Sequence, residues 1–181
     1  MVFLKPASAL VRTGEAVRLP SQSTNVHHEI ELVAVVGTEG KDIPEDEALD
    51  HVAAYAVGLD MTARDLQQEV KEQRHPWSVA KGFDTFAPLG PLTPAAAVGD
   101  PQALTLRLTV NGEVRQEAST ERLFFSVREL VHHCSQIFTL SPGDLLYTGT
   151  PSGVGPVHPG DELRATATGL APLHVSVGRP E

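Results

Sequence analysis

Short apolar segments separated by polar turns dominate the pattern of this chain, and such segments are typical of β-strands. The segment 27–37 is rich in β-branched residues and ends at a glycine, so it predicts a strand. The apolar segment 53–60 predicts a second strand. Apolar and polar residues alternate over 104–110, and the Asn-Gly pair at 111–112 predicts a hairpin with 113–117 as its return strand.

Other apolar segments are shorter and lie between turn residues. Two of them are followed by proline or lysine-proline, which suits edge strands because proline cannot donate a hydrogen bond to a neighbouring strand. These edge strands are predicted at 2–4 and 16–19, and further strands at 145–147, 163–168 and 173–177.

Helical signals are fewer than strand signals. Pro44 is followed by three acidic residues, which predicts a short helix because negative charge is favourable at a helix N-terminus. The segment 62–65 resembles a capping box and predicts a helix running toward Arg74. A capping box at 126–129 opens a stripe of apolar residues at helical spacing over 127–138, which predicts the best helix of the chain.

Composition supports a fold with many turns. The chain has 181 residues, enough for one domain with a real core, and it contains 15 glycines and 14 prolines. We therefore predict a single domain over 1–181 of the α+β class, predominantly β, rather than a helical bundle.

Charge and cysteine content exclude several classes of protein. The formal net charge is -9 and no cluster of lysine or arginine is present, which argues against nucleic acid as a partner. No apolar run has the length of a membrane span, so no membrane partner is expected. Cys134 is the single cysteine and the first residues do not form a signal-peptide core, so the expected location is cytoplasmic.

Candidate chemistry begins on the predicted strand 27–37. Glu29 and Glu31 share one face of this strand, with their Cα atoms about 6.5 Å apart, and Val33 and Val35 continue that face, which should point into the core. Carboxylates near a core need a compensating charge. A hard divalent cation such as Mg²⁺ is the simplest one, and Asp60, which ends the next apolar run, is the expected third ligand.

Each of these residues also has an ordinary interpretation. An isolated Glu-x-Glu pair is most often exposed on an edge strand. Arg64 can simply pair with Asp65 or cap a helix, and Lys81 and Gln67 can lie on a solvated surface. The glycine-rich segment 148–155 can be a plain turn.

Several segments together, in order and spacing, resemble the small single-domain members of the fumarylacetoacetate hydrolase family. The resemblance extends over nearly the whole chain, and five motifs in register are far more specific than any one of them. The segments that carry it are Phe3-Leu4-Lys5-Pro6, 26–32 (VHHEIEL), 58–65 (GLDMTARD), Trp77 with 81–86 (KGFDTF), Asn111-Gly112 with Gln116, and Gly143-Asp144 with 148–155 (TGTPSGVG).

The resemblance implies a mixed, twisted β-sandwich roll with a few short helices, of the fumarylacetoacetase C-terminal-domain type, in a homodimer. It implies one Mg²⁺ or Mn²⁺ per chain, bound by Glu29, Glu31 and Asp60. It further implies small 2-oxo or 1,3-dicarbonyl carboxylic acids as substrates. The reactions it implies are hydrolysis of acylpyruvates, decarboxylation of oxaloacetate or isomerisation of hydroxy-dienedioates through a metal-chelated enolate.

The resemblance also suggests roles for other side chains. Lys81 would stabilise the enolate or a leaving carboxylate, and Arg64 with Gln67 would hold the acid end of the substrate. Thr150 would donate to a substrate carboxylate. His28 is counted among the candidate catalytic residues. It is expected to orient a metal ligand or to pack beside the metal rather than to exchange protons.

One feature of the family has no counterpart in the sequence. Hydrolytic members carry a His–Glu dyad on a lid segment upstream of the strand that here begins at residue 3. Either this member lacks the dyad or the recorded chain starts late. The alternative function is therefore a non-catalytic, metal-binding member that serves as a structural or regulatory subunit.

Overall fold

The long strand predicted at 27–37 is the centre of the structure, but it breaks at Glu29. The computed structural model describes residues 1–179, and it divides this segment into β3 (Val26–His28) and β4 (Ile30–Val36). β4 pairs in antiparallel register with β5 (Val52–Leu59), the strand that leads to Asp60. The break at Glu29 lets β3 join a different sheet from β4.

Short strands make up most of the remaining structure. They are β1 (Leu10–Arg12), β2 (Ala16–Arg18), β6 (Thr62–Ala63), β7 (Ala87–Leu89), β8 (Thr93–Pro94), β9 (Thr105–Val110), β10 (Glu113–Ser119), β11 (Leu145–Tyr147), β12 (Gly155–Pro156), β13 (Glu162–Ala167) and β14 (Leu173–Gly178).

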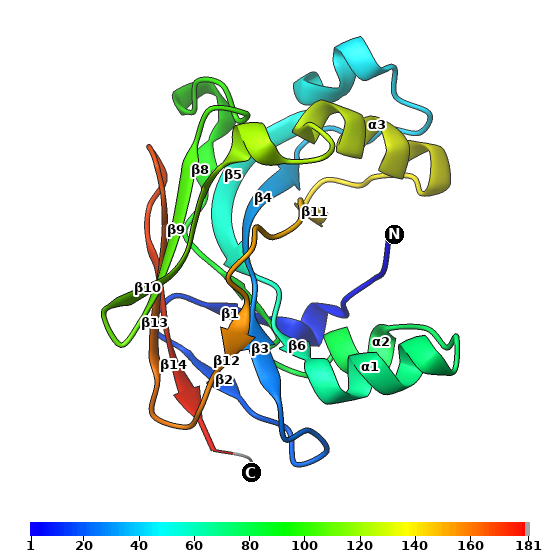
Figure 1. Cartoon of the computed structure of the whole chain (residues 1–181). Helices are drawn as coiled ribbons and strands as arrows, with labels where there is room; N and C mark the ends of the chain where they lie inside the picture. The colour runs from blue at the N-terminus through cyan, green and yellow to red at the C-terminus, as the bar shows by residue number, and fades with distance from the viewer. Residues whose placement is uncertain (180–181) are drawn as a thin grey trace.

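The strands form three sheets (Figure 1). The first has the order β1-β7-β5-β4-β11, with β8 paired to β5, the second β10-β9-β13-β14-β2, and the third β12-β3-β6. The β1–β7 and β14–β2 pairs are parallel and the other named pairs antiparallel. The fold is therefore mostly β with mixed sheets, as predicted.

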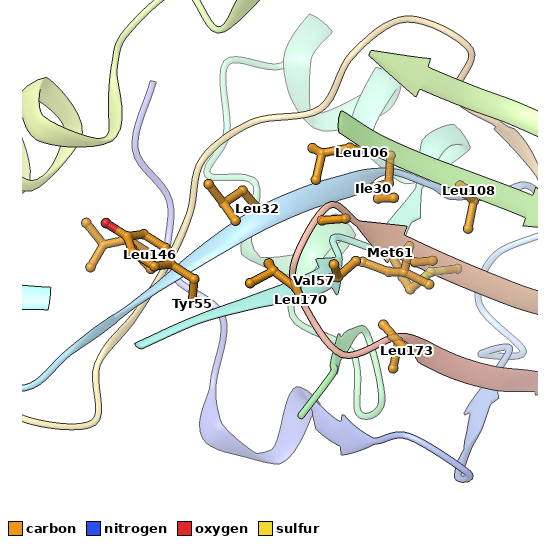
Figure 2. Close-up of a cluster of buried hydrophobic side chains, with 14 of the residues drawn as sticks. Ile30, Leu32, Tyr55, Val57, Met61, Leu106, Leu108, Leu146, Leu170 and Leu173 are labelled. Carbon is orange, nitrogen blue, oxygen red and sulfur yellow. The ribbon is translucent and has the colours of Figure 1, made fainter. Parts of the chain in front are cut away.

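The main core lies between the first two sheets. Figure 2 shows Ile30 and Leu32 of β4 in one buried cluster with Leu106 and Leu108 of β9 and Leu173 of β14. These side chains are at most 2 % exposed, so the core-facing side of β4 carries the even-numbered residues.

The face of β4 that carries Glu31, Val33 and Val35 is buried as predicted, but it is not the face that meets the main core. Val33 and Val35 are buried, but they lie outside the main core cluster on the opposite side of the sheet. Because the first sheet is covered on both faces, burial alone does not distinguish them.

Helices lie at the edges of the sheets (Figure 1). The α-helices are α1 (Arg64–Glu72), α2 (Ser78–Lys81) and α3 (Val127–Ile137). The 3-10 turns are η1 (Ala7–Ala9), η2 (Glu45–His51), η3 (Ala95–Ala97) and η4 (Thr120–Arg122).

The capping-box predictions had different outcomes. Ser126 and Glu129 form the full reciprocal box at the start of α3, as predicted. Helix α1 exists, but its N-cap is Ala63, which has no side-chain acceptor, and the Thr62 hydroxyl donates instead to the Asp60 carbonyl at 3.1 Å. The segment 62–65 therefore starts a helix without being a capping box.

Two local predictions were wrong. Residues 2–4 form no strand, and Lys81 ends helix α2 instead of beginning a loop. Within residues 1–179, no helix is long and apolar enough to cross a bilayer.

Candidate metal centre

Three carboxylates meet where β4 and β5 pair. Glu29, Glu31 and Asp60 each offer an oxygen within 4.8 Å of the others, and the three residues are 7 %, 4 % and 2 % exposed. The antiparallel register places Ile30 opposite Leu59, and the Asp60 amide donates to the Glu29 carbonyl at 2.8 Å. The pairing of two distant strands thus brings together the three residues predicted as metal ligands.

A glycine makes room for this arrangement. Gly58 lies opposite Glu31, and a Cβ there would meet the ring of Tyr147 and the side chain of Val33, each at 2.6 Å. The Tyr147 hydroxyl donates to the Pro88 carbonyl at 3.2 Å. Burial first, and then the negative charge of Glu31 and Asp60, raises the pKa of Tyr147, so this ring stays neutral.

Lysine 81 is the most buried cation of the site. Its Nζ atom donates to Glu29 at 3.0 Å, to Asp60 at 2.5 Å and to the Thr62 hydroxyl at 2.6 Å. It is 2 % exposed and lies 5.0 Å from the centre of the Phe3 ring. Three acceptors satisfy its three N–H groups, which is how a buried ammonium group is tolerated.

Arginine 64 extends the site toward solvent. Its guanidinium donates to Glu29 through Nη2 and to Gln67 Oε1 at 2.6 Å through Nη1. The Arg64 side chain is 28 % exposed, whereas Gln67 is buried. The predicted pair at the acid end of the substrate is therefore adjacent to the carboxylate cluster and partly reachable from solvent.

Lysine 5 also belongs to the site, although the sequence analysis assigned it no role. Its Nζ donates to Asp60 Oδ1 at 2.5 Å and to the Met61 carbonyl at 3.2 Å. Burial is the largest influence on its pKa and lowers it, while Asp60 acts in the opposite direction. The Lys-Pro motif at 5–6 was the only sequence signal for this residue.

Glutamate 31 is the carboxylate with the weakest compensation. Its side chain accepts a hydrogen bond from the Gly149 amide at 2.6 Å, and no ion pair to it is found among residues 1–179. Burial, and then the neighbouring Asp60 carboxylate, raises its pKa well above the ordinary value. A divalent cation bound to three such oxygens would remove this cost, so the residues fit Mg²⁺ or Mn²⁺.

The two remaining predicted residues lie in a neighbouring hydrogen-bond network. His28 donates through Nδ1 to Gln116 Oε1 at 3.0 Å, since an amide oxygen can only accept, and Thr150 Oγ1 lies 2.9 Å from Gln116 Nε2. Burial lowers the pKa of His28, so its ring is neutral near pH 7. The structure thus places Lys81, Arg64 and the predicted metal ligands together, and joins His28 to Thr150 through Gln116.

Comparison with known proteins identifies the family of this chain. The chain matches the family model described as "Fumarylacetoacetate (FAA) hydrolase C-terminal" over residues 1–178. A mouse protein named oxaloacetate tautomerase FAHD1, mitochondrial, is 44 % identical over 181 residues, which is all of this chain and 82 % of that protein.

Solved structures agree with the sequence comparison. Fumarylpyruvate hydrolase from Pseudomonas aeruginosa, in complex with Mn²⁺ and pyruvate, has a TM-score of 0.94 and 48 % identity over 98 % of this chain and 78 % of that one. A 2-hydroxyhepta-2,4-diene-1,7-dioate isomerase from Mycobacterium marinum has a TM-score of 0.93 and 41 % identity, and the match covers 99 % of this chain and 69 % of that one. The chain therefore belongs to the fumarylacetoacetate hydrolase C-terminal family.

Proposed function

We propose that this chain is a Mg²⁺- or Mn²⁺-dependent enzyme acting on small 2-oxo dicarboxylic acids, with keto–enol tautomerisation of oxaloacetate as its reaction. The observation that carries the proposal is the buried cluster of Glu29, Glu31 and Asp60. Three cationic side chains, Lys5, Arg64 and Lys81, contact that cluster directly.

The charges of this site favour a dianionic ligand. The three carboxylates and the three cations cancel formally, so a bound divalent ion would leave two positive charges in excess. A buried site with this excess favours a ligand with two negative charges. Oxaloacetate near pH 7 meets that requirement.

The residues divide the work as follows. When bound, the metal would polarise the 2-oxo group as a Lewis acid. Lys81 Nζ lies beside the cluster and can stabilise the negative charge of the developing enolate oxygen by a hydrogen bond. Arg64 can hold the second carboxylate with its planar fork, and Thr150 can donate to a carboxylate oxygen.

The relatives support two reactions. Tautomerisation is favoured by the mouse oxaloacetate tautomerase, to which this chain aligns along its whole length. Hydrolysis of an acylpyruvate is the second candidate, since the fumarylpyruvate hydrolase of Pseudomonas aeruginosa is 48 % identical. Both reactions use a 2-oxo acid that can form an enolate.

The first experiment follows the enol absorbance of oxaloacetate with Mg²⁺, Mn²⁺ or EDTA, with pyruvate measured in parallel by a coupled assay. We expect the enol and keto forms to equilibrate faster than with metal alone, without pyruvate formation, and EDTA should abolish the effect. If pyruvate formed faster than with metal alone, the reaction would be decarboxylation, and the proposal of tautomerisation would be wrong.

Acetylpyruvate serves as the second substrate in the same assay. Its cleavage to acetate and pyruvate would favour the hydrolase. Metal binding without turnover of either compound would support the non-catalytic subunit. The homodimeric state and the cytoplasmic location stay predictions, and light scattering with purified protein would check the first.

A further inference from the structure

A bulge in strand β10 turns Gln116 toward the interior. Val114 pairs with Thr109 and Gln116 pairs with Leu108, so Arg115 is an extra residue on the β10 side. Without this offset Gln116 would lie opposite Arg107 and would share its exposed face. As it is, Gln116 is 1 % exposed between the exposed residues Arg115 and Glu117.

The surroundings of Gln116 fix which way its amide points. The backbone N–H of Ile30 can only donate, and it lies 3.0 Å from the atom assigned as Oε1. The nitrogen must then be the atom that faces Thr150 Oγ1 and the Pro151 carbonyl, each at 2.9 Å. The carbonyl can only accept, so both ends of the amide give the same assignment.

This assignment sets the direction of the Thr150 hydroxyl. Since Gln116 Nε2 donates to it, the Thr150 oxygen accepts, and its own hydrogen is free for another acceptor. Across residues 1–179 no hydrogen bond donated by this hydroxyl is found. Thr150 follows Gly149, whose amide donates to Glu31, so the loop that carries this hydroxyl contacts the carboxylate cluster.

We propose that Gln116 is a positioning residue, which holds the Thr150 loop and keeps the Thr150 hydroxyl as a hydrogen-bond donor to a carboxylate of the ligand. The inference rests on the proposed function, because it takes a 2-oxo carboxylate as the ligand of this site. Gly153 locks the same loop onto β10, since its φ is +100° and a Cβ there would lie 2.3 Å from the Arg115 carbonyl.

The test measures pyruvate binding to the Mn²⁺-loaded protein by titration calorimetry, independently of turnover. In Gln116→Glu the introduced carboxylate can still accept from Ile30, but it cannot donate to Thr150 and would attract the hydroxyl hydrogen. Loss of one hydrogen bond to a charged group predicts about 10- to 100-fold weaker pyruvate binding. Thr150→Val should weaken binding to a similar extent, and Thr150→Ser should restore it.

A double-mutant cycle separates positioning from general damage. Once the hydroxyl is removed by Thr150→Val, adding Gln116→Glu should cause no further loss. Additive losses, or wild-type affinity in Gln116→Glu, would overturn the inference. Oxaloacetate turnover in the wild-type protein tests the proposed function separately.

The matched control is Gln102→Glu. Gln102 makes two bonds of the same kinds away from the site, accepting from the Val127 amide at 2.7 Å and donating to the Thr120 carbonyl at 3.2 Å. We expect it to change pyruvate affinity less than twofold. Mn²⁺ affinity should be unchanged in Gln116→Glu, and a loss of it equal to the loss of pyruvate affinity would contradict the assigned role.

Discussion

The metal centre and the Gln116 network lie side by side, but they satisfy their buried polar atoms in different ways. In the metal centre the polar atoms belong to charged groups, namely Glu29, Glu31 and Asp60 against three cations. In the network a neutral amide links His28, Ile30, Thr150 and Pro151. Every polar atom of the Gln116 amide has a partner of the correct type.

This difference in how polar atoms are paired suits the metal centre to ligand binding and the Gln116 network to positioning. A cluster of buried charges is costly and changes when a cation or an anion enters, so it responds strongly to ligands. The Gln116 amide, whose polar atoms are all paired, gains nothing from a ligand and holds its shape. The metal centre is therefore suited to chemistry, and the network is suited to keeping Thr150 in place.

The largest effect is expected from removing a metal ligand. Asp60→Asn and Glu31→Gln keep the side-chain shapes but remove one charge each, so Mn²⁺ affinity should fall at least about 100-fold, and turnover with it. Calorimetric titration with Mn²⁺ measures the first quantity and the enol assay the second.

Glu121→Gln is the control for this change, since Glu121 is exposed. Wild-type activity in Glu31→Gln after careful removal of metal would show that the cluster does not bind the catalytic ion.

Lys81→Met should have the next largest effect. The methionine fills similar space but cannot donate to the developing negative charge, so turnover should fall about 10²- to 10³-fold. Mn²⁺ affinity should change much less, because the three carboxylates remain. Lys71→Met, on the exposed face of α1, is the matched control, and an equal rate in both variants would remove Lys81 from the mechanism.

Gly153→Ala tests the Gln116 network, through the loop that carries Thr150. The positive φ and the approach of the Arg115 carbonyl should together destabilise the protein by about 2–4 kcal/mol and weaken pyruvate binding. Gly160→Ala is the control, since φ is +94° there with nothing within 4 Å of the added Cβ, and about 1–2 kcal/mol is expected. Equal unfolding midpoints in urea for the two variants would show that the contact with β10 is unimportant.

The smallest expected effect is the pH dependence of stability, which reports directly on the buried charge of the metal centre. The pKa of Glu31 is raised in the folded, metal-free protein, so above the usual value near 4.5 the folded protein holds a proton that the unfolded chain has lost. The free energy of unfolding should therefore fall as pH rises from there to the folded-state pKa.

Thermal unfolding in EDTA across this pH range would measure the trend. Mg²⁺ should reduce it, and Glu31→Gln should lack the contribution of this group. Identical pH profiles for the wild type and Glu31→Gln in EDTA would contradict the assignment.

Sequence reasoning located the charged site better than the neutral one. Glu29, Glu31 and Asp60 could be predicted because they end or interrupt apolar runs, where a charge is conspicuous. Pairing of β4 with β5 is then enough to bring these three residues together. The role of Lys5 could not be predicted, because the Lys-Pro motif at 5–6 does not indicate a partner and the contact with Asp60 spans 55 residues of sequence.

The role of Gln116 was missed for a geometric reason, although His28 and Thr150 were predicted as site residues. Alternation along 113–117 would place Gln116 on the exposed face, and one inserted residue reverses that. Similarly, continuous apolar character at 30–36 indicated a strand but could not show which face meets the main core, since both faces are covered.

The bulge at Arg115 has a consequence for how the hairpin can change over evolution. The side chain at 115 is exposed, so many residue types can stand there. The number of residues is a different matter, because deleting or inserting one between the Asn-Gly turn and Gln116 would turn the amide to solvent and release Thr150. In this hairpin an insertion or deletion is therefore far more damaging than a substitution at position 115.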